Sequence, residues 1–364
     1  MVPGRSIFLY PFSLLYGLVT GFRNFLYNLE ILNSDEFTIP VICVGNITVG
    51  GTGKTPHTEY LASLLEKEFK VAILSRGYKR KSQGFRFAAP GSTAADIGDE
   101  PLQMYRKFPE VTIAVDGDRV RGVKKILEER PETNVIILDD GFQHRSITPG
   151  YSILLSDYER LMVRDHLLPY GNLRESLSNM NRADIILITK SPENISPIQR
   201  RILVREVDKR PYQNLYFTSL TYKEPINVFN GTHSETDILS QEGSENRGIV
   251  LVTGIANPCQ LYEYLAKKCS EIIHLPYGDH HSFTQKDIEK ITEAWSSLKS
   301  SSKYVITTEK DAVRLKEFTN IAEQIRPATF YIPVGIYFLN DDRAEFDKMI
   351  IDYVRKNKRN NRVS

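Results

Sequence analysis

Short runs of β-branched and apolar residues recur along the first two thirds of the chain, and helix-like stretches separate several of them. Continuous apolar strands that alternate with helices are typical of a parallel sheet covered on both faces, because its strands are buried on both sides. The runs are 41–44, 71–74, 111–115, 135–138, 153–155 and 185–188, and the helix-like stretches are 56–69, 100–108, 119–130 and 197–208. The pattern predicts an α/β domain with a doubly wound parallel sheet over residues 36–215.

The alternation restarts after a break. Residues 216–244 contain two extended pieces, within LYFTSL and INVF, and then a polar stretch that is typical of a loop. Strands are next predicted at 249–253, 271–275, 304–307 and 329–333, with helices at 259–268 and 284–298 and a short helix after Glu309. This second half predicts a smaller α/β domain over residues 245–350, joined to the first by a short β linker.

The first 35 residues form a distinct segment. Residues 6–22 are seventeen uncharged positions between Arg5 and Arg23, and seven aromatic residues lie between Ile7 and Tyr27. A spanning helix needs about 20 apolar residues, and this run is shorter and interrupted by Pro11. A membrane-interface helix, a helix packed on the core and a single anchor all remain open, whereas a cleaved signal peptide is disfavoured because bulky and basic residues follow. We expect residues 1–35 to associate with a membrane.

Composition narrows the class of protein. The chain has 364 residues, of which 41% are hydrophobic and 25% charged, which fits about two globular domains and excludes a disordered or polytopic membrane protein. Its three cysteines lack CxxC spacing, so neither a zinc site nor a disulfide framework is indicated and a reducing cytoplasm fits best.

Charge is unevenly distributed. The net charge of +2 gives no reason to expect a nucleic-acid partner. Five basic residues against one acidic residue give the tail, residues 351–364, a charge of +4, which leaves −2 on the rest of the chain. This tail is expected to be either solvated or attracted to an anionic surface.

A phosphate-binding loop follows the first predicted strand. The glycine-rich turn ends in Gly53-Lys54-Thr55, where a helix is predicted to begin. In such a loop, backbone N–H groups surround phosphate oxygens, the lysine reaches the β and γ phosphates, and the hydroxyl after it binds Mg²⁺. The nucleotide-binding residues are predicted to be Thr48, Val49, Gly50, Gly51, Thr52, Gly53, Lys54 and Thr55, with Thr48 standing where a glycine is usual.

Two acids follow the strand at 135–138. Asp139 and Asp140 resemble a Walker B element, whose carboxylate holds Mg²⁺ beside the phosphate loop, so the predicted metal ligands are Thr55, Asp139 and Asp140. A simple turn with acidic residues is the alternative. The 25-residue span 75–99 carries Arg76, Lys79, Arg80 and Lys81, which would meet an anionic substrate or stay solvated.

ATP is favoured over GTP as the nucleotide. After a late strand, residues 189–192 read Thr-Lys-Ser-Pro, without the acid that reads a guanine base. No lysine occurs between Gly45 and Gly53, where partition-type ATPases carry one, and this weakens the alternative of a scaffold ATPase. A membrane-associated ATPase switch without a small-molecule acceptor remains the rival of a small-molecule kinase.

Eight motifs in order along the chain resemble those of the tetraacyldisaccharide 4'-kinases. They are GNITVGGTGKTP, SRGYKRK, GDEP, VDGDRVRG, LDDGFQHR, LLPYGNLRE, DHHSF and TTEKDAVRL. The resemblance implies ATP- and Mg²⁺-dependent phosphorylation of the 4'-hydroxyl of a lipid A disaccharide 1-phosphate. It also implies two α/β/α domains joined by a two-stranded linker, and peripheral or monotopic association of the N-terminal segment with the cytoplasmic face of the bacterial inner membrane.

The same resemblance implies roles for individual residues. Asp99 of GDEP would be the general base, and His280 of DHHSF, preferred over His281, would be its partner. Contacts with Mg²⁺, phosphate or substrate would come from Glu100, Arg119, Arg174, Glu175 and His281. As alternatives, Asp99 is a helix N-cap and Arg119 and Arg174 pair with core acids. One departure concerns Lys79, because the family more often has Gly-Tyr-Gly-Arg where this chain has Gly77-Tyr78-Lys79-Arg80.

Overall fold

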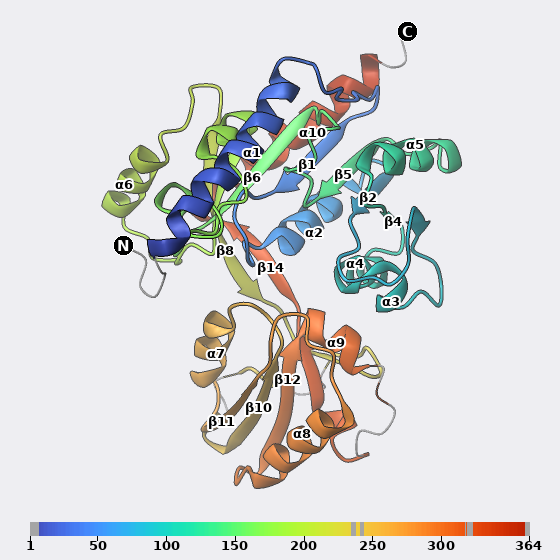
Figure 1. Ribbon diagram of the computed structural model, residues 1–364. Coiled ribbons are helices and arrows are strands. Elements are labelled where there is room, and N and C mark those ends of the chain that lie inside the picture. The colour runs from blue at the N-terminus through green and yellow to red at the C-terminus, as the bar shows by residue number, and fades with distance from the viewer. Residues whose placement is uncertain (1–6, 234–237, 241–243, 317, 319–322, 361–364) are drawn as a thin grey trace. The chain divides into compact units, whose positions relative to one another are not determined.

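Contacts between residues divide the chain into two compact units. The computed structural model describes residues 7–233, 238–240, 244–316, 318 and 323–360, the last three without their side chains. The first unit is Met1–Leu220 with Ile336–Ser364, and the second is Thr221–Gly335. Each unit contains one sheet with helices on it (Figure 1).

The sheet of the first unit is mostly parallel. Its strand order is β14-β8-β7-β6-β1-β5-β2-β4-β3, in which the run from β8 to β4 is parallel and β3 is antiparallel to β4. The strands are β1 (Val41–Gly45), β2 (Val71–Ser75), β3 (Arg86–Phe87), β4 (Thr112–Val115), β5 (Val135–Asp139), β6 (Tyr151–Asp157), β7 (Ile185–Thr189), β8 (Asn214–Tyr222) and β14 (Val334–Phe338). Each predicted strand of this domain is present, and the predicted fold class is confirmed.

Both faces of this sheet are covered. Alternate residues of each central strand enter opposite cores: Cys43 packs in one core and Val44 in the other. The first core takes side chains from α5 (Arg119–Glu129) and α6 (Pro197–Val207), and the second from α2 (Lys54–Leu65), α4 (Asp99–Lys107) and α10 (Arg343–Asn360). Burial on both faces explains why the strands are apolar without alternation.

The C-terminal segment corrects two predictions. β14 and α10 belong to the first unit, so the second domain ends at residue 335 rather than 350. Residues 351–360 continue a packed helix: Val354 is fully buried and Arg355 pairs with Glu68 at 2.6 Å. The prediction of a basic tail overlooked the four-residue spacing of Ile350 and Val354, which makes one helix face apolar. The end of the predicted tail, 361–364, lies outside the described residues.

The second unit repeats the α/β plan on a smaller scale. Its sheet has the order β11-β10-β12-β13-β9, parallel except for β9, with cores on both faces. Its elements are β9 (Ile226–Asn227), β10 (Arg247–Thr253), α7 (Cys259–Ala266), β11 (Glu271–Pro276), α8 (Gln285–Ser297), β12 (Ser302–Thr308), α9 (Glu309–Leu315) and β13 (Thr329–Ile332). The extended pieces expected in the linker therefore divide: β8 belongs to the first sheet and β9 to the second. β8 and β14 carry the chain between the units.

An N-terminal helix, α1 (Tyr10–Asn28), follows a 3-10 turn at Ile7–Leu9. Pro11 lies in its first turn, where a proline costs no hydrogen bond. Its buried residues are Ser13 and Asn24, while its large apolar side chains are exposed. Among the described residues, no helix has both the length and the apolar character needed to cross a membrane.

Candidate active site

The phosphate-binding loop connects β1 to α2, as predicted. Gly50 and Gly53 adopt φ values of 101° and 85°, a region that favours glycine, and Gly53 is the residue that precedes the helix. Thr48 forms a bridge with Leu173, and the N–H of Val49 donates to the carbonyl of Asn172 at 2.8 Å. Because Thr48 is paired with a neighbouring segment here, this position does not require the usual glycine.

The second half of the loop is held from two neighbouring strands. Thr189, the last residue of β7, donates from Oγ1 to the carbonyl of Thr52 at 2.9 Å. Lys190 donates to the carbonyl of Gly51 and pairs with Asp157 at 2.8 Å. The sequence analysis missed Lys190 and Asp157 as loop supports. Their place at the carboxyl ends of β7 and β6, beside the strand that leads into the loop, is the signal that would have found them.

Two acids stand at the end of β5. Asp139 is buried and accepts hydrogen bonds from Ser75 at 3.1 Å and Thr58 at 3.3 Å. Burial, and then the negative charges of Glu100 and Asp140, raise the pKa of Asp139 to about 7, against the opposing effect of Lys54. The charges of Glu100 and Asp140 therefore disfavour the ionised form of Asp139, and the charge of Lys54 partly compensates them.

Asp140 lies between the loop lysine and an arginine. Its Oδ2 is 3.6 Å from Nζ of Lys54 and 3.4 Å from Nη1 of Arg174, while its Oδ1 is buried without a hydrogen bond. Asp140 also has a φ of 51°, which is uncommon for a residue other than glycine. The predicted group of Lys54, Asp139, Asp140, Glu100 and Arg174 is thus brought together in the first unit.

Asp99 is the first residue of α4. Gly98, with a φ of 93°, occupies the N-cap position, so the alternative of Asp99 as a plain N-cap does not hold. A Cβ on Gly98 would come within 3.1 Å of the Tyr78 carbonyl, which explains the glycine here. Asp99 is half-buried and directly precedes Glu100, whose charge reaches Asp139.

Arg119 and Glu175 are enclosed by protein groups. The buried Arg119 donates to the carbonyls of Asp116 and Asp139. The buried Glu175 pairs with Arg182 at 2.6 Å and with Arg23 at 3.1 Å. Both residues are therefore enclosed and hold neighbouring segments together in this structure, and their contact with substrate or phosphate stays a prediction.

The basic loop after β2 lines a pocket of about 450 Å³. Its lining includes Tyr78, Lys79 and Arg80, together with Asp116, which Arg121 binds through two hydrogen bonds of 2.6 and 2.8 Å. Lys79 adopts a φ of 59°, so this lysine keeps the conformation that a glycine would favour at the position where the motif departs from the family.

The two histidines lie in the second unit. His280 has a φ of 58°, and its Nε2 is 3.0 Å from Nζ of Lys310. His281 instead binds Asp287 at 3.0 Å and stacks on Tyr277 with ring centroids 4.6 Å apart. His281 is therefore held by α8 and its flanking loop, while the ring nitrogens of His280 lie near Lys310 and 3.4 Å from Nη2 of Arg314, so the preference for His280 stays a prediction. Asp99 and His280 belong to different units, and their pairing stays a prediction.

Asp311, in the first turn of α9, links segments at the end of the second sheet. It is fully buried and accepts from the N–H of Gly254 at 2.8 Å and from Oγ1 of Thr308 at 2.7 Å. Arg314 lies 3.4 Å from its other oxygen and donates to the carbonyl of His281 at 2.9 Å. This network joins the DHHSF and TTEKDAVRL motifs.

Comparison with known proteins gives consistent matches over the whole chain. A family model described as "Tetraacyldisaccharide-1-P 4'-kinase" matches residues 5–355. A tetraacyldisaccharide 4'-kinase of Bacteroides thetaiotaomicron is 46% identical over 98% of this chain and 95% of its own length. One from Flavobacterium johnsoniae is 41% identical over 96% of this chain and 97% of its own. A crystal structure of LpxK from Aquifex aeolicus in complex with ATP is similar with a TM-score of 0.72 and 29% identity, covering 95% of this chain and 98% of that one.

Proposed function

The chain belongs to the tetraacyldisaccharide-1-P 4'-kinase family, and from that membership we propose that it transfers the γ-phosphoryl group of ATP to the 4'-hydroxyl of a tetraacyldisaccharide 1-phosphate, a lipid A precursor. The observation that carries the proposal is Lys54 at the start of α2, 3.6 Å from Asp140 at the end of β5. Phosphoryl transfer depends mainly on positioning and charge neutralisation, and this arrangement supplies both.

ATP is the proposed phosphoryl donor. The loop 46–53 and the first turn of α2 offer backbone N–H groups and the positive end of a helix dipole to phosphate oxygens. Lys54 adds a full positive charge and is only partly exposed, so its charge acts in a partly desolvated site. The Aquifex aeolicus relative was crystallised with ATP, which supports this donor.

Mg²⁺ is the proposed metal, with Thr55, Asp139 and Asp140 as its protein ligands. Within the described parts of the chain, no three or more His, Cys, Asp or Glu side chains are grouped to hold a metal. Kinases need fewer, because Mg²⁺ takes one or two carboxylates together with phosphate oxygens and water. The unpaired Oδ1 of Asp140 and the raised pKa of Asp139 fit a cation here. Bound Mg²⁺ would neutralise charge on the phosphates.

Asp99 is the proposed general base. A sugar hydroxyl is a weak nucleophile, and a carboxylate within hydrogen-bond reach accepts its proton as the new bond forms. Asp99 is half-buried in the first turn of α4, next to Glu100 of the acidic group. His280, held by Lys310, is proposed as its partner in taking up the proton.

The protein is proposed to meet its lipid acceptor at a membrane surface, through helix α1. The exposed side chains of α1 are unusually apolar for a surface helix, and Phe12, Leu15, Leu18, Val19 and Phe22 are each more than half exposed. Such a helix suits the interface of a bilayer, where aromatic rings are favourable. We place the protein at the cytoplasmic face of the inner membrane, bound peripherally or monotopically.

The test of the base is a steady-state assay with ATP, Mg²⁺ and detergent-dispersed disaccharide 1-phosphate. Asp99→Ala is expected to lower kcat by about 10²- to 10⁴-fold with little change in ATP affinity. Glu128→Ala, which removes an exposed carboxylate on α5, serves as the matched control and keeps wild-type kcat. If ATP affinity falls as far as kcat in Asp99→Ala, Asp99 belongs to the metal site and the assignment is wrong.

A further inference from the structure

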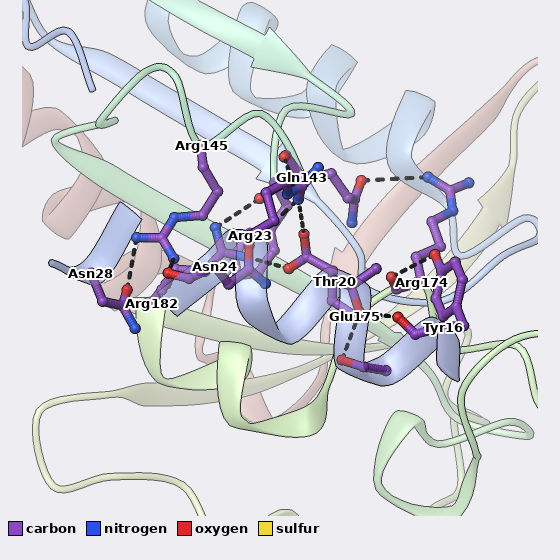
Figure 2. Close-up of polar contacts among 12 residues, drawn as sticks. Tyr16, Thr20, Arg23, Asn24, Asn28, Gln143, Arg145, Arg174, Glu175 and Arg182 are labelled. Carbon is purple, nitrogen blue, oxygen red and sulfur yellow. Dashed lines mark hydrogen bonds and ion pairs between the residues drawn. The ribbon is translucent and has the colours of Figure 1, made fainter. Parts of the chain in front are cut away.

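Helix α1 has two chemically different faces, and the buried one is polar. Its buried residues, Ser13 and Asn24, lie on this face, and Tyr16 and the half-exposed Arg23 reach from it to hydrogen-bond with protein loops. Figure 2 shows Tyr16, Arg23 and Asn24 of this face beside Gln143, Arg145, Arg174 and Glu175. These four residues belong to two segments, residues 140–146 after β5 and residues 166–175. Polar groups on a buried face need partners of defined geometry, so this contact fixes the helix more specifically than apolar packing would.

The contacts with residues 166–175 run along the length of the helix. Ser13 donates to the carbonyl of Leu167 at 2.9 Å and accepts from the N–H of Tyr170 at 2.9 Å. One turn further on, the hydroxyl of Tyr16 donates to the carbonyl of Arg174 at 2.8 Å. The helix therefore reaches the backbone of the residue whose side chain binds Asp140.

Arg23 contacts both segments at once. Its Nη2 is 3.1 Å from Oε1 of Glu175 and 3.4 Å from the carbonyl of Gln143. Glu175 is buried, and its other oxygen is taken by Arg182. Removing Arg23 would leave the buried carboxylate of Glu175 with the ion pair to Arg182 and the charge of Arg145 but without its second ion pair, which favours a rearrangement of the segment.

The same two segments carry the site. Arg174 binds Asp140 at 3.4 Å and Oε1 of Gln143 at 3.4 Å, and Gln143 donates to the carbonyl of Asn46, at the start of the phosphate-binding loop. From Arg23, a contact path to Asp140 thus passes through Gln143 and Arg174, and Glu175, which Arg23 also binds, is the chain neighbour of Arg174. Lys54 is the next group beyond Asp140.

We propose that Arg23 is a positioning residue for phosphoryl transfer: it fixes the segments that orient Arg174 and Asp140 beside Lys54, from a helix whose other face is exposed and apolar. This inference rests on the proposed function. It gives α1 a role in the chemistry that is separate from lipid contact, because Arg23 lies on the polar face. A displacement of about 1 Å at a reacting centre costs up to about 10²-fold in rate, which sets the size of the effect.

The experiment compares Arg23→Gln and Arg23→Lys with wild type. Arg23→Gln is expected to lower kcat by about 10- to 100-fold at saturating lipid, with the KM for ATP and binding to phospholipid vesicles unchanged. Arg23→Lys keeps the charge towards Glu175 and is expected to recover most of kcat. Arg164→Gln, which removes an arginine from a surface pair with Glu206, is the matched control and keeps wild-type kcat.

Amide hydrogen exchange gives a readout that does not depend on turnover. In Arg23→Gln, exchange is expected to rise in residues 140–146 and 166–175, including the N–H of Arg174, which donates to the carbonyl of Ile47 at 2.7 Å. Exchange in α8 of the second unit should not change. Unchanged exchange in the two segments, or wild-type kcat in Arg23→Gln, overturns the inference. Absence of transfer by the wild-type protein overturns the proposed function instead, and the exchange result still decides the role of Arg23.

Discussion

The two sheets of this protein end in acidic groups that are satisfied in opposite ways. In the second unit, Asp311 is buried and accepts from Gly254 and Thr308, with Arg314 beside it. In the first unit, Asp139 and Asp140 lie with Glu100 near one lysine, and an oxygen of Asp140 has no hydrogen bond. The protein itself completes the first kind of group, so it is structural. The second kind has like charges close together and an oxygen without a hydrogen bond, and such crowding of like charges is typical of functional sites.

The largest expected effect is the loss of activity when Lys54, beside the end of the first sheet, is replaced. Lys54→Ala should lower kcat for lipid phosphorylation by on the order of 10³-fold, because it removes the charge that meets the phosphates of ATP. Thermal unfolding should stay near that of wild type, since the ion pair of its side chain with Asp140 is 3.6 Å long and partly exposed. Lys125→Ala, on the exposed surface of α5, is the control. If Lys54→Ala transferred phosphate as fast as wild type, the end of the first sheet that carries Asp139 and Asp140 would not be the active site.

The second prediction compares the effect on stability of replacing an acid at the end of each sheet, Asp311 in the second unit and Asp140 in the first. Asp311→Ala should lower the free energy of unfolding by about 3–5 kcal/mol, because Arg314 loses its carboxylate partner and two buried donors, the N–H of Gly254 and the hydroxyl of Thr308, lose their acceptor. Asp140→Asn should leave it at or above the wild-type value, since it removes repulsion from Asp139. Urea denaturation measures both. Equal destabilisation by the two variants would contradict the distinction between Asp311 as a structural acid and Asp140 as a functional one.

The third prediction concerns acid sensitivity of the phosphate-binding loop. His57, in the first turn of α2, donates from Nδ1 to the carbonyl of Gly53 at 2.7 Å and accepts from Thr218 at 2.9 Å. Burial lowers its pKa from 6.5 to about 4. Between these values the unfolded state binds more protons, so stability present above pH 6.5 is lost as the pH falls towards 4.

The size of this loss is roughly 3 kcal/mol in total. Denaturation at pH 7 and pH 4.5 should show a smaller difference for His57→Asn than for wild type. His233→Asn, at an exposed histidine of the second unit, should leave the difference unchanged. An identical pH dependence in His57→Asn and wild type would show that His57 is not the sensitive group.

The smallest effects are expected from glycines at the two edges. A Cβ on Gly254 would lie 2.8 Å from Asp311, so Gly254→Ala should cost about 1–3 kcal/mol of stability. A Cβ on Gly51 meets nothing within 4 Å, so Gly51→Ala should fold as well as wild type. It should raise the KM for ATP about tenfold, because the methyl group occupies space that phosphate oxygens need. If Gly51→Ala lowered stability and left the KM for ATP unchanged, while Gly254→Ala kept wild-type stability, the contrast between the two sheets would be wrong.

Much of this arrangement is local in sequence and could be predicted. The strands, the phosphate-binding loop and the acids after β5 follow from apolar runs and from short motifs. The return of β14 and α10 to the first unit could not be predicted, because it depends on pairing between distant segments. The same reason applies to Arg119 and Glu175, whose burial depends on Asp139, Arg23 and Arg182 from elsewhere in the chain. The motifs identified these residues as important without showing what they contact.

The most direct test of the account is the fate of the γ-phosphate. Purified protein is incubated with γ-labelled ATP and Mg²⁺, with and without detergent-dispersed disaccharide 1-phosphate, and the position of the label in the lipid is determined by tandem mass spectrometry. For a 4'-kinase, label is expected at the 4' position of the lipid, and ATP consumption is expected to depend on the lipid. ATP hydrolysis at the same rate without lipid, and no label in the lipid, would contradict the proposed function and support a membrane-associated ATPase switch.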